Sequence, residues 1–413
     1  MQLTDEQFAL IKEQFKTLKE RSPFYARKFD GIDLSDVQTQ EDFEKLPFSE
    51  KADLREVYPL GLQAVPDEEV VRIHSSSGTT GTPVVIPYTQ QDVIDWATQF
   101  ARCYETAGIT NKDRIQITPG YGLWTAGIGF QLGCERLGAM AIPMGPGNTE
   151  KQLKMMQDLH STVITGTSSY ALLLAEEISK RGLRDKLDLR KGVIGSERWG
   201  EKMRNRIANE MGIEIFDIYG LTEVYGPGIG ISCKAHNGMH IWEDYVYAEI
   251  VDPKTGEVLP DGEVGELVLT TLRKQGAPLI RYRTHDLTRI IPGDCTCEFG
   301  CHHPRIDILT GRTDDMIKVK GCNMFPAQIE EVLQFTDGAS SEYQVMIEAV
   351  NGRDVLTVLF ETALEGEARE HCEQQLAAIF KAKIGCTPEA KGVPLGELPR
   401  SEKKTKRIFD SRY

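Results

Sequence analysis

Short apolar runs alternate with stretches of helical apolar spacing through the middle of the chain. The strand-like runs lie at 114–118, 139–144, 162–165, 193–194 and 213–219, and the helical stretches at 124–137 and 170–178. Because parallel strands need a crossover between them, this alternation is typical of a parallel sheet covered by helices. We therefore expect an α/β fold built on a mostly parallel sheet.

The pattern changes twice after this region. Between 245 and 289, strands and turns replace the alternation, which predicts an antiparallel, β-rich subdomain. Beyond 311, a strand, a helix, two strands and a second helix follow, which is enough for a small α+β domain. Since 413 residues exceed the length at which single cores stop growing, we expect a large N-terminal domain at 1–311 and a small mobile C-terminal domain at 312–413.

Charge and composition narrow the class of protein. Forty-eight basic residues stand against 62 acidic ones, a formal charge of −14, which argues against general nucleic-acid binding. The first 21 residues lack the apolar run of a signal peptide, and no stretch approaches the roughly 20 apolar residues of a membrane span. We expect a cytoplasmic protein without membrane partners, in which the 9 cysteines are reduced and a cluster of them binds metal.

A run of hydroxyl-bearing residues and glycines separates two strand-like segments near residue 75. The run is Ser75, Ser76, Ser77, Gly78, Thr79, Thr80, Gly81 and Thr82. Glycines let successive backbone N–H groups face one concavity, and hydroxyls add donors, so the run suits phosphate oxygens. A plain polar hairpin is the alternative. No Gly-Lys-Ser/Thr follows, so the run is not a Walker A loop and does not indicate a kinase or GTPase.

Four further motifs follow this run along the chain. They are Ile-Tyr-Gly-Leu-Thr-Glu at 218–223, Tyr-Arg-Thr-His-Asp-Leu at 282–287, Gly-Arg-Thr-Asp-Asp-Met-Ile-Lys at 311–318 and Leu-Pro-Arg-Ser-Glu-Lys-Lys at 398–404. Together with 75–82 they resemble, in the same order, the motifs of adenylate-forming enzymes. The stretches 21–25, 121–124, 242–244 and 323–326 are most similar to phenylacetate–CoA ligases. This resemblance covers nearly the whole chain.

The resemblance implies an ATP-dependent, AMP-forming acid–thiol ligase. Such an enzyme adenylates an aryl carboxylic acid, here phenylacetate or a close relative, and transfers the acyl group to coenzyme A. One alternative passes the acyl or AMP group to a carrier protein or another cofactor. A second is a catalytically impaired nucleotide-binding homologue, for which Lys403 is the hint, because the family usually has glycine there. The sequence does not give the preferred acid, and a homodimer remains open.

The resemblance also assigns roles to individual residues. Lys404, Thr222 and Glu223 are the expected catalytic residues, with Glu223 a Mg²⁺ ligand and Lys404 at the α-phosphate. Asp286 is expected to accept hydrogen bonds from the ribose hydroxyls. Outside their motifs, surface salt bridges would be the favoured interpretation of Glu223 and Asp286. The expected ATP-binding residues are Ser75, Ser76, Ser77, Gly78, Thr79, Thr80, Gly81, Gly195, Ser196, Glu197, Tyr219, Gly220, Asp286 and Arg312.

The acid pocket is predicted around the start of the helix at 124–137. Its expected residues are Tyr121, Trp124, Gly127, Ile128 and Tyr219. Aromatic walls beside small residues make a flat slot for an aryl ring, whereas ordinary packing of helix on sheet is the alternative.

The two half-reactions need two geometries, because Lys404 must leave before a thiolate can reach the adenylate. By resemblance, the C-terminal domain rotates about Asp314, and coenzyme A passes Lys320 and Gly321.

Cysteine and histidine residues gather in two short stretches of the sequence. In a reducing compartment, thiolates so close together suit tetrahedral Zn²⁺. By resemblance the predicted ligands are Cys233, His240, Cys295 and Cys297, with Cys301, His303 and His236 as alternatives. Four protein ligands would make the ion structural; scattered free thiols are the alternative interpretation.

Overall fold

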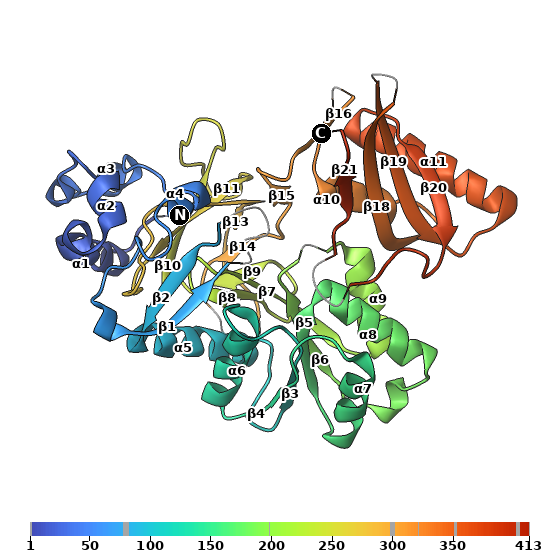
Figure 1. Ribbon diagram of the computed structural model, residues 1–413, viewed down its shortest axis with the longest axis horizontal. Coiled ribbons are helices and arrows are strands. Elements are labelled where there is room, and N and C mark those ends of the chain that lie inside the picture. The colour runs from blue at the N-terminus through green and yellow to red at the C-terminus, as the bar shows by residue number, and fades with distance from the viewer. Residues whose placement is uncertain are drawn as a thin grey trace.

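The computed structural model describes residues 2–76, 82–197, 199–297, 302–320, 322–350, 353–401 and 405–412. Figure 1 shows two parts, which we call lobes. The N-terminal lobe runs to β15 and is coloured blue to yellow-orange, and the C-terminal lobe begins at β16 and is coloured orange to red. This arrangement agrees with the predicted α/β fold with a larger first part.

Helices of the N-terminal lobe surround its sheets (Figure 1). They are α1 (Asp5–Arg21), α2 (Pro23–Lys28), α3 (Gln40–Glu44), α4 (Lys51–Glu56), α5 (Gln90–Thr106), α6 (Ala126–Leu137), α7 (Thr149–Asp158), α8 (Ser168–Lys180) and α9 (Glu201–Met211), with 3-10 turns at Leu34–Asp36, Asp67–Glu69 and Arg184–Lys186. In α1, a capping box at Thr4 fixes the start, and Ile11, Phe15 and Leu18 are buried at helical spacing.

In the described chain, nine strands form the main sheet, in the order β13-β14-β9-β8-β7-β6-β5-β3-β4. Its parallel part comprises β3 (Arg114–Ile117), β4 (Met140–Pro143), β5 (Val163–Thr167), β6 (Lys191–Gly195) and β7 (Glu214–Leu221). Its antiparallel part comprises β8 (Gly226–Ser232), β9 (Met239–Ile241), β13 (Ile290–Ile291) and β14 (Arg305–Ile306). The change of direction at β7 places the carboxyl end of the last parallel strand beside the turn into β8.

Two smaller antiparallel sheets complete the N-terminal lobe. One contains β10 (Val246–Val251), β11 (Gly265–Thr271), β12 (Tyr282–Thr288) and β15 (Gly311–Arg312), as expected for the β-rich subdomain. The other is the hairpin of β1 (Val70–Ser75) and β2 (Val85–Thr89), which flanks the glycine-rich run. The predicted domain boundary at 311–312 falls within β15, whose Arg312 still pairs with β12. The boundary and the hinge at Asp314 stay predictions.

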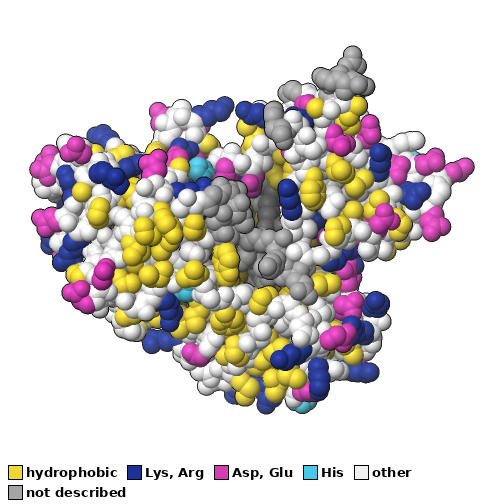
Figure 2. Space-filling model, viewed as in Figure 1, with side chains coloured by type: hydrophobic (Ala, Val, Ile, Leu, Met, Phe, Trp, Pro, Cys, Tyr) yellow, Lys and Arg dark blue, Asp and Glu magenta, His cyan; other side chains and the backbone are white. Residues whose placement is uncertain are grey.

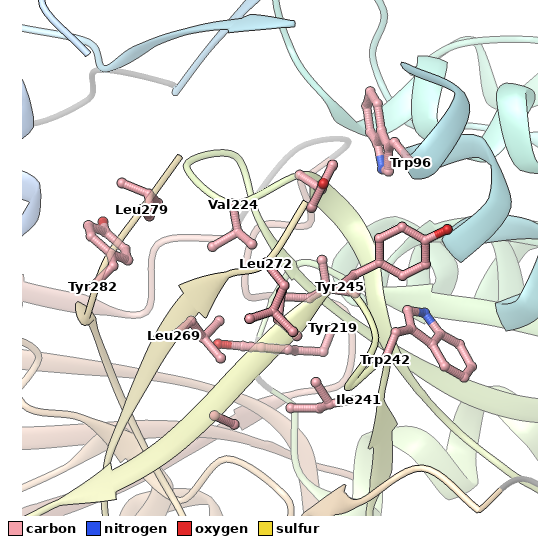
Figure 3. Close-up of a cluster of buried hydrophobic side chains, with 14 of the residues drawn as sticks. Trp96, Tyr219, Val224, Ile241, Trp242, Tyr245, Leu269, Leu272, Leu279 and Tyr282 are labelled. Atoms are coloured by element: carbon pink, nitrogen blue, oxygen red, sulfur yellow. The ribbon is translucent and has the colours of Figure 1, made fainter. Parts of the chain in front are cut away.

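The lobes have separate apolar cores. The main core lies between the two larger sheets and α5, and Figure 3 shows part of it, with Trp96, Trp242 and Tyr245 beside residues of β7, β11 and β12. A second core packs α7, α8 and α9 on the parallel strands. The third joins residues between Ile317 and Cys386.

The C-terminal lobe pairs a mixed sheet with two helices. Its elements are β16 (Ile317–Val319), β17 (Cys322–Met324), α10 (Pro326–Gln334), β18 (Ala339–Val350), β19 (Arg353–Thr362), α11 (Gly366–Ile384), β20 (Glu389–Pro394) and β21 (Ile408–Asp410). In the sheet order β20-β19-β18-β21, β18 and β19 are antiparallel and the outer strands are parallel to their neighbours.

The sequence-based expectations differ from the structure around two helices. Helix α6 begins at Ala126 rather than 124, because the Leu123 carbonyl accepts from Ser75 N and Gly127 N donates to the Gly120 carbonyl, so neither group makes an intrahelical bond. Helix α5 was not predicted, although its buried Val93, Trp96 and Phe100 recur at helical spacing. Among the described residues, no helix combines the length and apolarity needed to cross a bilayer.

Candidate functional site

The entrance to the glycine-rich run is tightly held. Ser76 closes the hairpin, because its Oγ accepts a hydrogen bond from Val84 N at 2.9 Å. Ser75 N donates to the Leu123 carbonyl at 2.9 Å, and His74 Nδ1 donates to the same carbonyl at 3.2 Å. Ser75 and Ser76 therefore position the start of the run against the segment before α6. Ser77, Gly78, Thr79, Thr80 and Gly81 lie outside the described residues.

The Thr-Glu motif lies at the turn that follows β7. A Cβ at Gly220 would lie 2.0 Å from the Gly226 carbonyl oxygen, so this close approach of β7 and β8 requires glycine. Thr222 Oγ1 is 3.2 Å from Thr125 Oγ1. Glu223 is 3 % exposed, and its Oε1 lies 2.9 Å from Lys51 Nζ. The Glu223 carboxylate is therefore buried beside one ammonium group and is not part of a surface salt bridge.

Three motifs meet in a charged network at β7, β12 and β15. The Tyr219 hydroxyl donates to Asp286 Oδ2 at 2.6 Å, and Arg312 Nη1 donates to Asp286 Oδ1 at 2.9 Å. Burial raises the pKa of Asp286, while Arg312 and Tyr219 favour its charged form. A carboxylate has about four acceptor positions, so this network leaves Asp286 able to accept hydrogen bonds from sugar hydroxyls.

His285 stands where the resembled motif has glycine. Its φ is +64°, the left-handed conformation that glycine adopts without strain and that costs another residue roughly 1 kcal/mol. His285 Nδ1 lies 2.9 Å from Thr313 Oγ1 and 3.3 Å from Glu266 Oε1. The hydrogen bond with Glu266 raises the pKa of His285. These contacts maintain the conformation that presents the neighbouring Asp286.

The predicted acid-pocket residues lie around the start of α6. Gly127 is buried, and a Cβ there would lie 2.8 Å from both the Gly120 carbonyl oxygen and the Tyr121 ring. Trp124 is 44 % exposed, whereas Ile128 packs against the main core. The Tyr121 hydroxyl is buried and has no hydrogen-bond partner within the described residues. The segment thus offers an exposed indole and an unsatisfied hydroxyl beside a position that admits only glycine.

The motif at 195–197 connects the N-terminal lobe to the segment after residue 397, which we call the C-terminal tail. Gly195 lies at the end of β6, with no room for a Cβ against Ile218, and Ser196 has a left-handed φ of +69°. Glu197 Oε2 accepts from Ser169 N at 2.9 Å, and its Oε1 accepts from Thr405 N at 2.8 Å. The predicted ATP contacts of these residues stay predictions. Their position brings the tail to the start of α8.

The remaining predicted residues lie at the lobe boundary and in the C-terminal lobe. Lys404 and Gly321 fall outside the described residues. Lys320 is exposed, has a left-handed φ of +50°, and donates from Nζ to the Thr387 carbonyl at 3.3 Å. Asp314 accepts two hydrogen bonds from Arg312, at 2.8 and 3.0 Å. The roles of Lys404, Lys320 and Asp314 stay predictions.

Four cysteine and histidine side chains converge near β9, from the segments that follow β8 and β13. The Sγ atoms of Cys233, Cys295 and Cys297 and one ring nitrogen of His240 all lie within 4.8 Å of one another. Cys233 Sγ is 3.6 Å from Cys295 Sγ, and Cys297 Sγ is 4.0 Å from His240 Nε2. His240 Nδ1 donates to the His303 carbonyl at 2.9 Å, which turns the Nε2 lone pair toward the thiols.

The alternative zinc ligands have other surroundings. His236 Nδ1 is 2.8 Å from Arg204 Nη2, and the His303 ring contacts Trp242 and Glu243. Cys301 lies outside the described residues. The described chain therefore brings together the four residues that we predicted as ligands.

Sequence reasoning missed several residues of this region. Lys51 reaches Glu223 from α4, and Arg400 in the tail reaches Glu176 on α8. His74 binds the Leu123 carbonyl in the segment before α6, and Thr125 joins the same segment to Thr222. Because these partners are far apart along the chain, no local motif pairs them.

Comparisons with known proteins agree with this organisation. The family model described as AMP-binding enzyme matches residues 12–272, and the AMP-binding enzyme C-terminal domain matches residues 321–412. The chain is 43 % identical over 422 aligned residues to the phenylacetate-coenzyme A ligase of Escherichia coli (strain K12), covering 99 % of this chain and 95 % of that protein.

A solved 2-hydroxyisobutyryl-CoA ligase has a similar structure in two states. In its postadenylation state, in complex with R3-HIB-AMP, the TM-score is 0.89 at 25 % identity, covering 98 % of this chain and 89 % of that one. In its thioesterification state, with 2-HIB-AMP and CoA, the TM-score is 0.71 at 26 % identity with the same coverage. Over equal coverage, the arrangement described here is thus more similar to the postadenylation state.

Proposed function

This chain belongs to the family of AMP-binding enzymes, and from that premise we propose that it is an ATP-dependent, AMP-forming aryl-acid–CoA ligase. Phenylacetate or a close relative is the proposed acid. One observation carries the proposal: a chain similar to a phenylacetate-coenzyme A ligase over nearly its full length also joins three separate motifs through Tyr219, Asp286 and Arg312.

The proposed reaction has two steps. A carboxylate oxygen of the acid attacks the α-phosphorus of ATP, the bond to the β-phosphate oxygen breaks, and pyrophosphate leaves with that electron pair. The thiolate of coenzyme A then attacks the acyl carbonyl carbon, and AMP leaves as the thioester forms. The first step needs in-line approach to phosphorus and the second needs approach to the face of the acyl carbonyl. Because negative charge builds on oxygen in both, the protein contributes mainly by positioning and by hydrogen-bond donors.

Residues of both lobes would serve the first step. The run at 75–82 would cradle the phosphates, Thr222 would contact them, and Asp286 would hold the ribose, which its free acceptor positions permit. Lys404 would bring an ammonium group to the α-phosphate and the acid. Tyr121 and Trp124 would bound the acid, since the exposed indole offers an aromatic face and the buried Tyr121 hydroxyl lacks a partner among the described residues.

Glu223 is the residue that would hold Mg²⁺. Magnesium bound with nucleotides usually takes one or two carboxylates, with phosphates and water completing its coordination. The buried Glu223 carboxylate fits this requirement, and Lys51 beside it would share the negative charge. When bound, the ion would neutralise phosphate charge.

Cys233, His240, Cys295 and Cys297 are the proposed ligands of a structural Zn²⁺ ion. Tetrahedral coordination with zinc–sulfur bonds of about 2.3 Å separates ligand sulfurs by about 3.8 Å, which is close to the 3.6 Å between Cys233 and Cys295. The donor set is soft and closed, and the His303 carbonyl orients His240. The ion would tie the segment after β8 to the segment after β13, with no role in either reaction step.

A panel of aryl and alkyl acids, assayed for pyrophosphate release with ATP, tests the ligase. We expect release with phenylacetate or a close relative, followed by a CoA thioester when coenzyme A is added. Adenylate without thioester would favour a carrier protein or another cofactor as the acceptor. If the protein binds nucleotide but releases no pyrophosphate from ATP with any acid of the panel, the impaired homologue would be favoured.

A further inference from the structure

The C-terminal tail contacts the N-terminal lobe on both sides of residues 402–404. On the amino side, Arg400 Nη2 donates to Glu176 Oε1 at 2.7 Å and Arg400 Nε donates to Glu176 Oε2 at 3.0 Å. This two-pronged contact joins the tail to α8. It is largely shielded, because the Arg400 and Glu176 side chains are only 12 % and 22 % exposed. Charge-assisted contacts of this geometry are among the stronger polar interactions.

On the carboxyl side, Thr405 is bound at the other end of the same helix. Its backbone N–H donates to Glu197 Oε1 at 2.8 Å, and its hydroxyl donates to Ser169 Oγ at 2.7 Å. Glu197 is itself oriented by Ser169 N and Ser168 Oγ at the start of α8. A single helix of the N-terminal lobe therefore holds the tail on both sides of the segment that contains Lys404.

The Arg400–Glu176 contact can break without leaving an unpaired charge. Glu176 also accepts from Arg206 Nη2 at 2.8 Å, within its own lobe. Arg400 also donates to both oxygens of buried Glu361 on β19, at 2.9 and 2.8 Å, within the C-terminal lobe. Separating a charged pair is costly when a partner stays buried and uncompensated. Here each partner keeps a counter-ion in its own lobe, so the contact suits repeated making and breaking.

We propose that Glu176, together with Glu197, positions the Lys404 segment for adenylation and releases it for thioester formation. The inference rests on the proposed two-step function. The greater similarity of the described arrangement to the postadenylation state than to the thioesterification state supports it. Glu176 is a positioning residue, because it acts on the nucleotide through Arg400 and the segment beyond it.

Replacement of Glu176 by alanine tests the proposal on the two half-reactions separately. In Glu176→Ala, acyl-adenylate formation from acid and ATP should slow about tenfold, since a shielded ion pair is lost while other lobe contacts remain. One such contact is Lys202 Nζ to the Leu333 carbonyl at 3.2 Å. Thioester formation from supplied phenylacetyl-adenylate and coenzyme A should be unchanged or faster. Single-turnover rates of both steps give the ratio.

Glu177→Ala is the matched control. Glu177 lies on the same helix with the same 22 % side-chain exposure, but it pairs with Arg181 of its own lobe. This variant should leave both rates within about twofold of wild type. Equal loss of both half-reactions in Glu176→Ala, or no loss of adenylation, would overturn the proposal.

Small-angle X-ray scattering tests the contact without turnover. Wild type and Glu177→Ala should scatter as the described arrangement of lobes, and Glu176→Ala should shift toward a mixture of arrangements. If wild type adenylates no acid in the panel, the proposed function fails, and scattering still decides whether Glu176 holds the lobes together. Identical scattering from all three proteins would count against the contact.

Discussion

The N-terminal lobe contains two polar clusters that differ in how their charges are balanced. Tyr219 and Asp286 meet where β7 faces β12, and Cys233 and Cys295 meet where the segments after β8 and β13 converge. In the first cluster the negative charge of Asp286 is matched by Arg312. In the second, three thiols and an imidazole face one another without a charged partner in the set.

This difference separates a site for an exchangeable ligand from a site for a permanent one. A carboxylate that is already paired keeps its structure when a nucleotide arrives or leaves. Thiols bind a metal cation as thiolates, so the cysteine cluster acquires charges and a partner for them only when the ion is bound. We therefore expect variants of the Asp286 cluster to change catalysis, and variants of the cysteine cluster to change stability. On the face seen in Figure 2, acidic and basic side chains are interspersed over both lobes.

Lys404→Ala should have the largest effect, and it extends the comparison to the C-terminal tail. Removing a donor to the transition state slows adenylation by about 10²–10³-fold. ATP affinity, measured by calorimetry, should change little, and the melting temperature should not fall. Lys406→Ala, an exposed lysine two residues away whose ammonium lies over the Phe409 ring, is the control. Unchanged pyrophosphate exchange in Lys404→Ala would remove this lysine from the catalytic set.

Cys297→Ser should have the next largest effect, on stability. Wild type purified without chelator should hold about one zinc per chain by mass spectrometry, and the variant should lose most of it. The melting temperature should drop by roughly 5 °C or more, because a structural ion contributes to folding free energy. Cys322→Ser, a partly exposed thiol of the C-terminal lobe, should retain the metal. A wild type without zinc would favour plain free thiols.

Asp286→Asn tests the Asp286 cluster as the site of the exchangeable nucleotide. The variant keeps the shape of the side chain but removes its charge, so the KM for ATP should rise about tenfold. The zinc content should stay at the wild-type level. Asp307→Asn is a matched control, because Asp307 pairs with Arg289 at 2.8 Å near the end of the same sheet. Equal KM values in both variants would place the ribose elsewhere.

His74 offers the smallest effect and a test by pH. Burial lowers its pKa from 6.5 to about 4 in the folded protein. Above pH 6.5 the imidazole is neutral in both states, whereas between 6.5 and 4 the unfolded chain takes up the proton, so folding stability falls as pH falls. Between pH 7 and 5.5, His74→Gln should lose about 1 kcal/mol less than wild type. Urea unfolding at both pH values measures the difference, and parallel losses would contradict the buried neutral imidazole.

Local patterns predicted the sheet strands well and the ends of some helices less well. Strands such as 114–117 and 163–167 agree with their predicted runs, because alternation and apolar composition are local properties. The start of α6 moved to Ala126, since the Leu123 carbonyl accepts from Ser75 N and Gly127 N donates to the Gly120 carbonyl, contacts outside the helix that no local pattern predicts. Glu197 illustrates a different gap: its motif suggests a nucleotide contact, whereas its observed partners are α8 and Thr405.

The sequence by itself determined the α/β fold class and the family motifs in their order, because residue type and spacing encode both. Its resemblance to known ligases, and not spacing alone, selected the four cysteine and histidine residues that meet. Only the tertiary structure decided that Lys51 neutralises Glu223, that Arg312 and Tyr219 share Asp286, and that α8 holds the tail on both sides of 402–404. Such partners lie far apart along the chain, and ion pairing depends on distance in space, which no local pattern records.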